Sequence, residues 1–211
     1  MAGNSLSQAS MKSALKKFSE ELQKNKIEHL IFFVTLLGLI RDGGPIVGDD
    51  DVDFYVNQIF YNRTRDLLSS LGFNLDYSSA PNNTKHFIQV NGQLDNIQVR
   101  ADFYFYNSNL DENYLLEPWN FLANPNDKNN VLKLPKPLVF PLKVIPYEDT
   151  EVFIPQHSKI ICEFLYGKNW SIPKKKKTEY RVVMLGGRPL IIQNKFKLSK
   201  LFSHLLLKFV D

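Results

Sequence analysis

The sequence contains a single cysteine, Cys162, so it can form no intrachain disulfide and offers no set of cysteine ligands for a zinc site. Long apolar runs are also missing. The longest, near LIFFVTLLGLI, spans about eleven residues and includes a threonine and a glycine, which makes it too short to cross a bilayer. The first residues, MAGNSLSQASMKSALKKF, contain no apolar stretch or cleavage pattern of the signal-peptide type. We therefore expect a cytoplasmic protein.

The composition argues against disorder outside the ends of the chain and makes the protein mildly basic. Of the 211 residues, 44% are hydrophobic and 13% are aromatic, which is enough to build a core. The 26 basic and 22 acidic residues give a net charge of +4. A charge of this size favours anionic ligands without requiring nucleic acid, and we predict no nucleic-acid partner. The length predicts a single domain over residues 1–211.

The hydrophobic pattern alternates between helical and strand periods. Helical spacing of apolar residues predicts a first helix over residues 8–26, with Met11, Leu15, Phe18 and Leu22 on its buried side. Further helices are predicted from Thr35 to a stop at Gly43–Gly44, from residue 61 to just before Gly72, and from residue 157 to Gly167. Buried strands are predicted over residues 29–34, 52–57, 86–90 and 99–106, with a hairpin turn near Asn91–Gly92, a loop over 107–130 and a proline-interrupted β-like stretch over 138–155. This order predicts an α+β fold, a mixed β-sheet flanked by helices.

The end of the chain, residues 194–211, reads as a basic amphipathic helix with one apolar stripe. Two roles fit this stripe. It could pack on the core or on a partner helix, or it could lie on an anionic membrane surface as a peripheral contact at the inner face of the membrane.

The stretch GDDDVDFYV places four aspartates directly before strand-forming residues. Alternate residues of a strand share a face, so Asp49, Asp51 and Asp53 are predicted to lie together, with Asp50 turned away. Carboxylates about 7 Å apart at the Cα level can converge on one small ion, and all-oxygen ligation is the preference of Mg²⁺ or Mn²⁺. Asp102, flanked by strand formers in VRADFYFY, is the candidate to complete the site from a neighbouring strand.

A solvated acidic turn is the alternative reading of these aspartates. It accounts for Asp49 and Asp50, but it accounts less well for Asp51 and Asp53, because apolar Val52 interleaves with them. An EF-hand loop is excluded, since no glycine and terminal glutamate follow at the required offsets. The metal site is therefore the favoured interpretation.

The order of these motifs resembles that of the LicD and fukutin-related family of the nucleotidyltransferase superfamily. VTLLGLIR, the seven residues DGGPIVG, and DDDVD are similar to the family's GTLLGxxR, a seven-residue gap and DxDxD. Further on, FPL, YEDTEVFIP and YGKNWSIP are similar to its C-terminal signature, so the resemblance covers roughly residues 29–173. Val34 stands where the family usually has glycine, and Val47–Gly48 stands where it usually has Pro-Trp.

The resemblance implies a nucleotidyltransferase-like fold and a Mg²⁺- or Mn²⁺-dependent phosphotransferase. Such an enzyme moves phosphocholine, phosphoribitol or phosphoglycerol from a CDP-linked donor to a hydroxyl of a surface glycan or glycolipid, as in lipopolysaccharide or capsule biosynthesis. Asp51 and Asp53 would hold the metal, Asp49 would ligate a second ion, and Asp102 would complete the site and take the acceptor's proton.

The donor's phosphates would meet Thr35, Gly38 and Arg41, together with backbone N–H groups of residues 36–38 at the start of the short helix. Each of these residues has a structural alternative: Thr35 as a helix cap, Gly38 as a packing position and Arg41 as an ion-pair partner of a nearby aspartate. We rank His86, Arg100 and His157 as structural or surface residues.

Two other functions share the same acids. One is a true nucleotidyltransferase that adds a nucleotide to a small molecule or protein and releases pyrophosphate. The other is a binding subunit without catalytic activity, which the complete acid set argues against.

Overall fold

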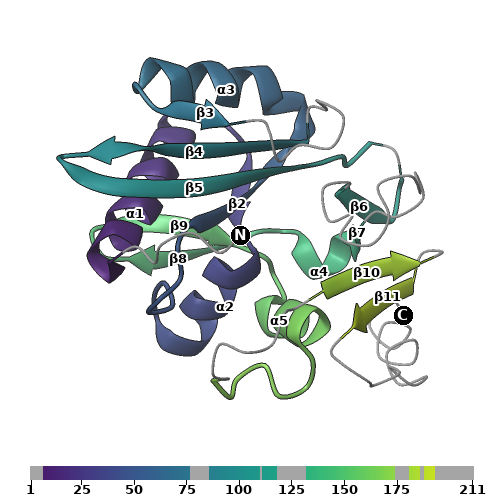
Figure 1. Ribbon diagram of the computed structural model, residues 1–211. Coiled ribbons are helices and arrows are strands. Elements are labelled where there is room, and N and C mark those ends of the chain that lie inside the picture. The colour runs from purple at the N-terminus through teal and green to yellow at the C-terminus, as the bar shows by residue number, and fades with distance from the viewer. Residues whose placement is uncertain are drawn as a thin grey trace.

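The computed structural model describes residues 7–76, 86–109, 111–117, 132–173, 181–185 and 188–192. At its centre lies a five-stranded mixed sheet with the strand order β1-β2-β5-β4-β3 (Figure 1). Its strands are β1 (His29–Ile31), β2 (Val52–Asn57), β3 (Asn74–Asp76), β4 (Phe87–Leu94) and β5 (Ile97–Tyr106). Within this sheet β2 and β5 run parallel, and the other neighbouring strands run antiparallel. The predicted mixed α+β sheet is confirmed.

One face of the sheet is covered by helices α1 (Gln8–Lys24) and α3 (Tyr61–Ser70). Phe18 of α1 packs edge-on against Phe54 of β2 and Phe103 of β5, and Tyr61 of α3 contacts Phe105. Because side chains alternate along a strand, this packing assigns the even positions of β2 and the odd positions of β5 to the core beneath α1. Residues 53 and 102 therefore lie on the opposite face.

The remaining helices lie below the strands β4 and β5 in the view of Figure 1. They are α2 (Phe33–Asp42), the single turn α4 (Lys136–Val139) and α5 (Ser158–Tyr166), and α5 packs on α2. A short 3₁₀ turn, η1 (Gln58–Phe60), joins β2 to α3. None of the helices in the described residues has the length and apolar character needed to cross a bilayer.

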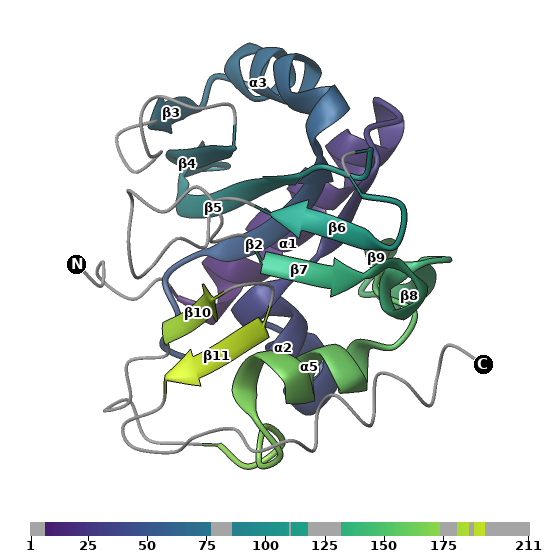
Figure 2. The same cartoon turned by 90° about the vertical axis from the view of Figure 1, so that its right-hand side faces the viewer.

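Three hairpins complete the described chain: β6 (Tyr114–Glu117) with β7 (Leu132–Pro135), β8 (Lys143–Tyr147) with β9 (Thr150–Ile154), and β10 (Arg181–Leu185) with β11 (Arg188–Ile192). Asn107, just past β5, forms a bridge with Leu116 and so joins the first hairpin to the sheet (Figure 2). The second hairpin lies beside β1 through β9. The amphipathic segment predicted over residues 194–211 lies outside the described residues.

Several predicted elements have the predicted bounds. The strand over 52–57 is observed as predicted, and Gly43 and Gly167 follow the last residues of α2 and α5 as their C-caps. The apolar stripe of the first helix is fully buried, but the helix ends at Lys24 because Lys26 adopts a left-handed backbone conformation with φ of 52°.

The predicted strand over 29–34 is too long. It ends at Ile31, and α2 begins at Phe33, two residues before the predicted start at Thr35. Phe33 has a φ of 44°, so the chain turns sharply between β1 and α2. The predicted stretch of β-structure over 138–155 also begins differently, since its first two residues close the helical turn α4.

The predicted turn at Asn91–Gly92 is wrong. β4 continues to Leu94, and the chain reverses at Asp95–Asn96, where both residues have positive φ, the pattern of a type I′ hairpin. Gly92 serves packing instead, because a Cβ atom there would lie 2.6 Å from the Phe73 ring.

Candidate active site

The register of β2 on β5 brings two of the predicted acids face to face. Asp53 is paired directly with Asp102 in the parallel ladder, and neighbouring strands lie about 4.8 Å apart. Both side chains are nearly inaccessible, with 4% and 7% exposure. Residues 49 sequence positions apart thus form one buried acidic pair on neighbouring strands.

Three further aspartates approach this pair from the loop before β2. Carboxylate oxygens of Asp49, Asp50 and Asp51 all lie within 4.8 Å of one another. The expectation that Asp50 turns away from Asp49 and Asp51 is wrong, because the strand begins only at Val52 and the alternation of side chains does not extend back to these residues.

Asp53 is fixed by the first turn of α2. Its Oδ2 atom accepts hydrogen bonds from the backbone N–H groups of Val34 (3.0 Å) and Thr35 (3.3 Å) and from the Thr35 hydroxyl (3.3 Å). The same hydroxyl accepts a hydrogen bond from the Asp53 backbone N–H at 2.8 Å. The first N–H groups of a helix lack partners within the helix and form the positive end of its dipole, so α2 holds this carboxylate in place.

Asp102 is fixed from β4, the strand on the other side of β5 from β2. Gln89, its partner on β4, donates a hydrogen bond to Oδ1 at 2.9 Å, and the Tyr104 hydroxyl lies 3.4 Å from Oδ2. The Tyr104 ring packs against Phe33, the first residue of α2, with centroids 4.7 Å apart. Two strands and a helix therefore restrain the second buried carboxylate.

Arg100 lies at the edge of this group, two residues before Asp102 on the same face of β5. Its Nη1 atom donates to Asp50 Oδ2 at 3.0 Å, and its Nε atom donates to Asn91 Oδ1 at 2.8 Å. Sequence reasoning ranked Arg100 as a structural or surface residue and did not name Gln89. The even spacing of residues 100 and 102 was a signal for Arg100, whereas Gln89 could be found only through the pairing of β4 with β5.

The crowding of carboxylates opposes their ionisation. Burial, followed by the negative charges of Asp53 and Asp102, raises the pKa of Asp51 well above its ordinary value. Burial raises the pKa of Asp53 in the same way, with Asp49 and Asp102 adding to the effect, and burial raises the pKa of Asp102 to about 6. A divalent cation among these oxygens would offset both the desolvation and the repulsion.

The donor set fits such a cation. It consists of carboxylate oxygens from one loop and two adjacent strands, which is the ligand type that Mg²⁺ and Mn²⁺ prefer. The aspartate triad of the loop could bind a metal, with Asp53 and Asp102 beside it.

The predicted phosphate-binding residues have defined surroundings. Thr35 is buried with 1% exposure, and its hydroxyl bonds to Asp53. A Cβ atom on Gly38 would lie 2.5 Å from the Gly44 carbonyl oxygen, so Gly38 allows the loop that leads to the aspartates to pack on α2. Arg41 forms a bidentate ion pair with the adjacent Asp42, at 2.6 and 2.8 Å.

The backbone donors predicted over residues 36–38 lie deeper in the helix than expected. Because α2 begins at Phe33, the N–H of Leu36 donates to the Phe32 carbonyl within the helix. The N–H groups free of intrahelical partners are instead those of Val34 and Thr35, which bind Asp53.

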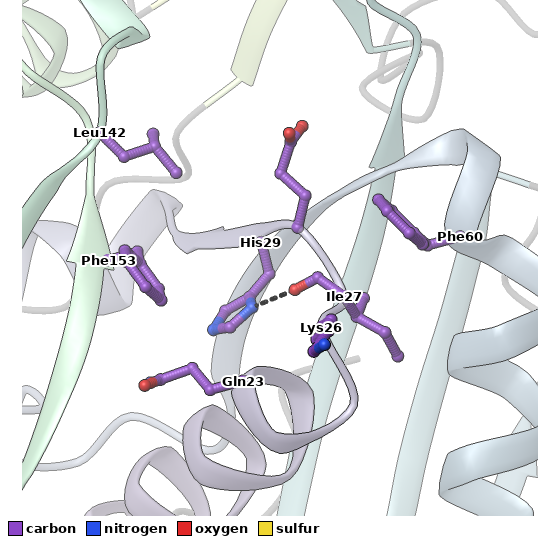
Figure 3. Close-up of a pocket in the computed structure, with 8 residues that line it drawn as sticks. Gln23, Lys26, Ile27, His29, Phe60, Leu142 and Phe153 are labelled. Atoms are coloured by element: carbon purple, nitrogen blue, oxygen red, sulfur yellow. Dashed lines mark hydrogen bonds between the residues drawn. The ribbon is translucent and has the colours of Figure 1, made fainter.

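A separate cavity of about 460 Å³ lies on the other side of the sheet (Figure 3). Its lining includes His29, whose Nδ1 bonds to the Ile27 carbonyl at 2.8 Å, and Phe153, which contacts the imidazole edge-on. His29 pairs with Val56 at the far end of β2, so this cavity is not part of the aspartate site. Burial lowers the pKa of His29 to about 4, which keeps the ring neutral.

A mixed sheet in which two adjacent strands present aspartates beside the first turn of a short helix defines the class of nucleotidyltransferase-fold domains. Within that class, the chain belongs to the LicD/FKTN/FKRP nucleotidyltransferase-domain family, whose model matches residues 26–157, more than half of the chain. The resemblance inferred from the motifs is therefore confirmed.

Comparisons with individual proteins give less information than the family model does. No curated protein matches the chain. Among solved structures, it is similar to the lincosamide antibiotic adenylyltransferase LnuA in its lincomycin-bound form, with 12% sequence identity and a TM-score of 0.48 over 72% of this chain and 82% of that chain.

Proposed function

We propose that this protein is a Mg²⁺- or Mn²⁺-dependent transferase that moves a phospho-alcohol from a CDP-linked donor to a hydroxyl of a glycan or glycolipid. The observation that carries the proposal is the convergence of Asp51, Asp53 and Asp102 beside α2 in a chain of the LicD family. The family implies a nucleotide-activated donor. That the transferred group is a phospho-alcohol is part of our proposal.

Asp49, Asp51, Asp53 and Asp102 would hold the metal. A divalent cation held there would supply positive charge that offsets the negative charge of the donor's phosphates and the charge that develops as CMP departs. The protein's own contribution is rigidity, because hydrogen bonds from α2 and from Gln89 fix two of the four carboxylates.

The reaction exchanges one phosphorus–oxygen bond for another. The acceptor's hydroxyl oxygen bonds to the phosphorus that carries the alcohol, the bond from that phosphorus to the bridging oxygen breaks, and CMP leaves with the electron pair. Asp102 would take the hydroxyl proton as general base. Its position opposite Asp53 and beside Tyr104 supports this role.

Thr35, Gly38 and Arg41 stay the predicted phosphate-binding set. The contacts that each residue makes indicate how it would contribute to phosphate binding. Thr35 and Gly38 would shape the backbone next to the phosphates, through Asp53 and through the Gly44 loop respectively. Arg41 would have to release Asp42 in order to bind the donor's phosphates. If it does so, Arg41→Gln should show a higher KM for the donor.

The proposal is tested by product analysis. The protein would be incubated with MgCl₂, a mixture of acceptor glycans and, separately, CDP-choline, CDP-ribitol, CDP-glycerol or CTP. Release of CMP from one CDP-alcohol is the expected result, and Asp51→Ala should abolish it. Asp66→Ala is the matched control, because Asp66 is an exposed acid on α3 that pairs with the neighbouring Arg65.

Other products would point to the other functions. Pyrophosphate released from CTP would support nucleotide transfer and overturn the proposal. If no donor were turned over and none raised the melting temperature in the presence of MgCl₂, the transferase proposal would fail and the non-catalytic alternative would be favoured.

An acceptor carried on a lipid would suit a membrane contact by residues 194–211. Pelleting of the full chain and of a chain ending at residue 193 with anionic liposomes tests this part. Equal pelleting of the two chains would exclude the contact.

A further inference from the structure

Asp50 and Arg100 form an ion pair at the edge of the aspartate site. Both side chains keep 26% of their surface exposed, and the guanidinium is held in place by a second hydrogen bond, from Nε to Asn91. Asn91 lies opposite Arg100 in the ladder between β4 and β5, so the position of the guanidinium is set by the sheet. Arg100 is thus a fixed positive charge.

This charge lies close to Asp50 and Asp102. Asp50 has its carboxylate within 4.8 Å of those of Asp49 and Asp51, and Arg100 is near enough to Asp102 to favour its charged form. The guanidinium would therefore repel any cation bound among the loop aspartates. The cation would also have to compete with the guanidinium for the oxygens of Asp50.

We propose that Arg100 is a positioning residue that cancels the charge of Asp50 and withholds Asp50 from the metal, so that Asp50 adds nothing to cation binding. The inference rests on the proposed metal site and concerns which acids that site uses. The pair acts as a neutral unit: Arg100 cancels the charge of Asp50, and the other carboxylates alone determine the affinity for the cation.

The size of the effect follows from Coulomb's law. A unit charge several ångströms from a divalent ion, partly screened at the protein surface, changes the ion's affinity on the order of ten-fold. Removing Arg100 should raise the affinity by that factor, and removing the charge of Asp50 should lower it by a similar factor. Removing both should leave it nearly unchanged.

The test measures Mn²⁺ binding to the full chain by calorimetry and by electron paramagnetic resonance, without nucleotide. Arg100→Gln should bind Mn²⁺ about ten-fold more tightly than the unmodified protein, and Asp50→Asn about ten-fold more weakly. The double variant should lie within about three-fold of the unmodified protein. Arg100→Lys keeps the charge and should bind nearly normally.

Arg65→Gln is the matched control, since it removes the same charge from an ion pair on α3 away from the site. A double variant that binds as weakly as Asp50→Asn would overturn the proposal, because Asp50 would then be a ligand. Unchanged affinity in all variants would also overturn it. Circular dichroism of each variant checks that it folds. If Arg100→Gln does not fold, Asn91→Ala provides a second test of the proposal, because it removes the hydrogen bond that holds the guanidinium without changing any charge.

Failure of the proposed function is a separate outcome. If no CDP-alcohol were a donor, the Mn²⁺ affinities would still follow or contradict the predicted pattern, because they are measured without any donor.

Discussion

Replacing Thr35 by valine removes one hydroxyl and keeps the shape of the side chain, so it isolates the link between α2 and Asp53. Thr35 has 1% exposure, and its hydroxyl both accepts from the Asp53 backbone N–H at 2.8 Å and donates to Asp53 Oδ2 at 3.3 Å. In Thr35→Val the N–H loses this partner in a buried position. An unsatisfied buried donor costs about 1–3 kcal/mol, so we expect the free energy of unfolding to fall by about 2 kcal/mol.

Thr35→Ser provides the comparison, because it keeps the hydroxyl and loses only a methyl group, worth about 0.8 kcal/mol. In a chain of this length, 2 kcal/mol corresponds to a fall in melting temperature of about 4–8 °C. The hydroxyl also orients a predicted metal ligand, and loss of such a support typically weakens metal binding by about 10- to 100-fold.

The assays are urea unfolding and Mn²⁺ calorimetry on the unmodified protein and both variants. Thr35→Val should be the less stable variant and the weaker Mn²⁺ binder, and Thr35→Ser should bind Mn²⁺ nearly normally. If valine were tolerated as well as serine in both measurements, Thr35 would not position Asp53 and the reasoning would be refuted.

Three further predictions follow from other parts of the structure. Gly38→Ala places a Cβ atom 2.5 Å from the Gly44 carbonyl oxygen, so we expect a loss of about 1–3 kcal/mol in urea unfolding together with weaker Mn²⁺ binding, and unchanged binding would show that the loop adapts freely. Asp51→Asn removes a half-buried acid whose pKa is raised by burial and by the neighbouring carboxylates, so without metal it should melt at a higher temperature than the unmodified protein, whereas MgCl₂ should no longer raise its melting temperature; a lower metal-free melting temperature would contradict this. His29 has its pKa lowered to about 4 by burial, so the stability it contributes is complete above its unfolded pKa near 6.5 and is lost as the pH falls from there toward 4. Urea unfolding should show about 2 kcal/mol more loss between pH 7 and pH 5 in the unmodified protein than in His29→Gln, and parallel losses would refute it.

The sequence by itself determined the elements that depend on neighbouring residues. The stripe of α1, the strand Val52–Asn57 and the glycine stops after α2 and α5 follow from periodicity and from the backbone freedom of glycine, which act over a few residues. The spacing of Asp51, Asp53 and Asp102 in strand-like surroundings was also sufficient to predict that two strands would bring acids together.

Local sequence patterns were insufficient to locate the turn between β4 and β5 and the start of α2. Asn91–Gly92 is a favoured turn dipeptide, but the observed turn uses Asp95–Asn96, because a glycine at position 92 is needed beneath the Phe73 ring. The start of α2 at Phe33 requires a positive φ at a phenylalanine, which no local preference predicts.

Only the tertiary structure decided which partner each polar group of the site takes. Asp53 meets the hydroxyl of Thr35, Asp102 meets Gln89, and Asp50 meets Arg100 fifty residues away. Such pairings depend on strand register and on how a helix approaches the sheet, and both are set by packing of the whole core. The sequence therefore determined which residues carry the charge, whereas the fold decided that Arg100 holds Asp50 beside the other aspartates.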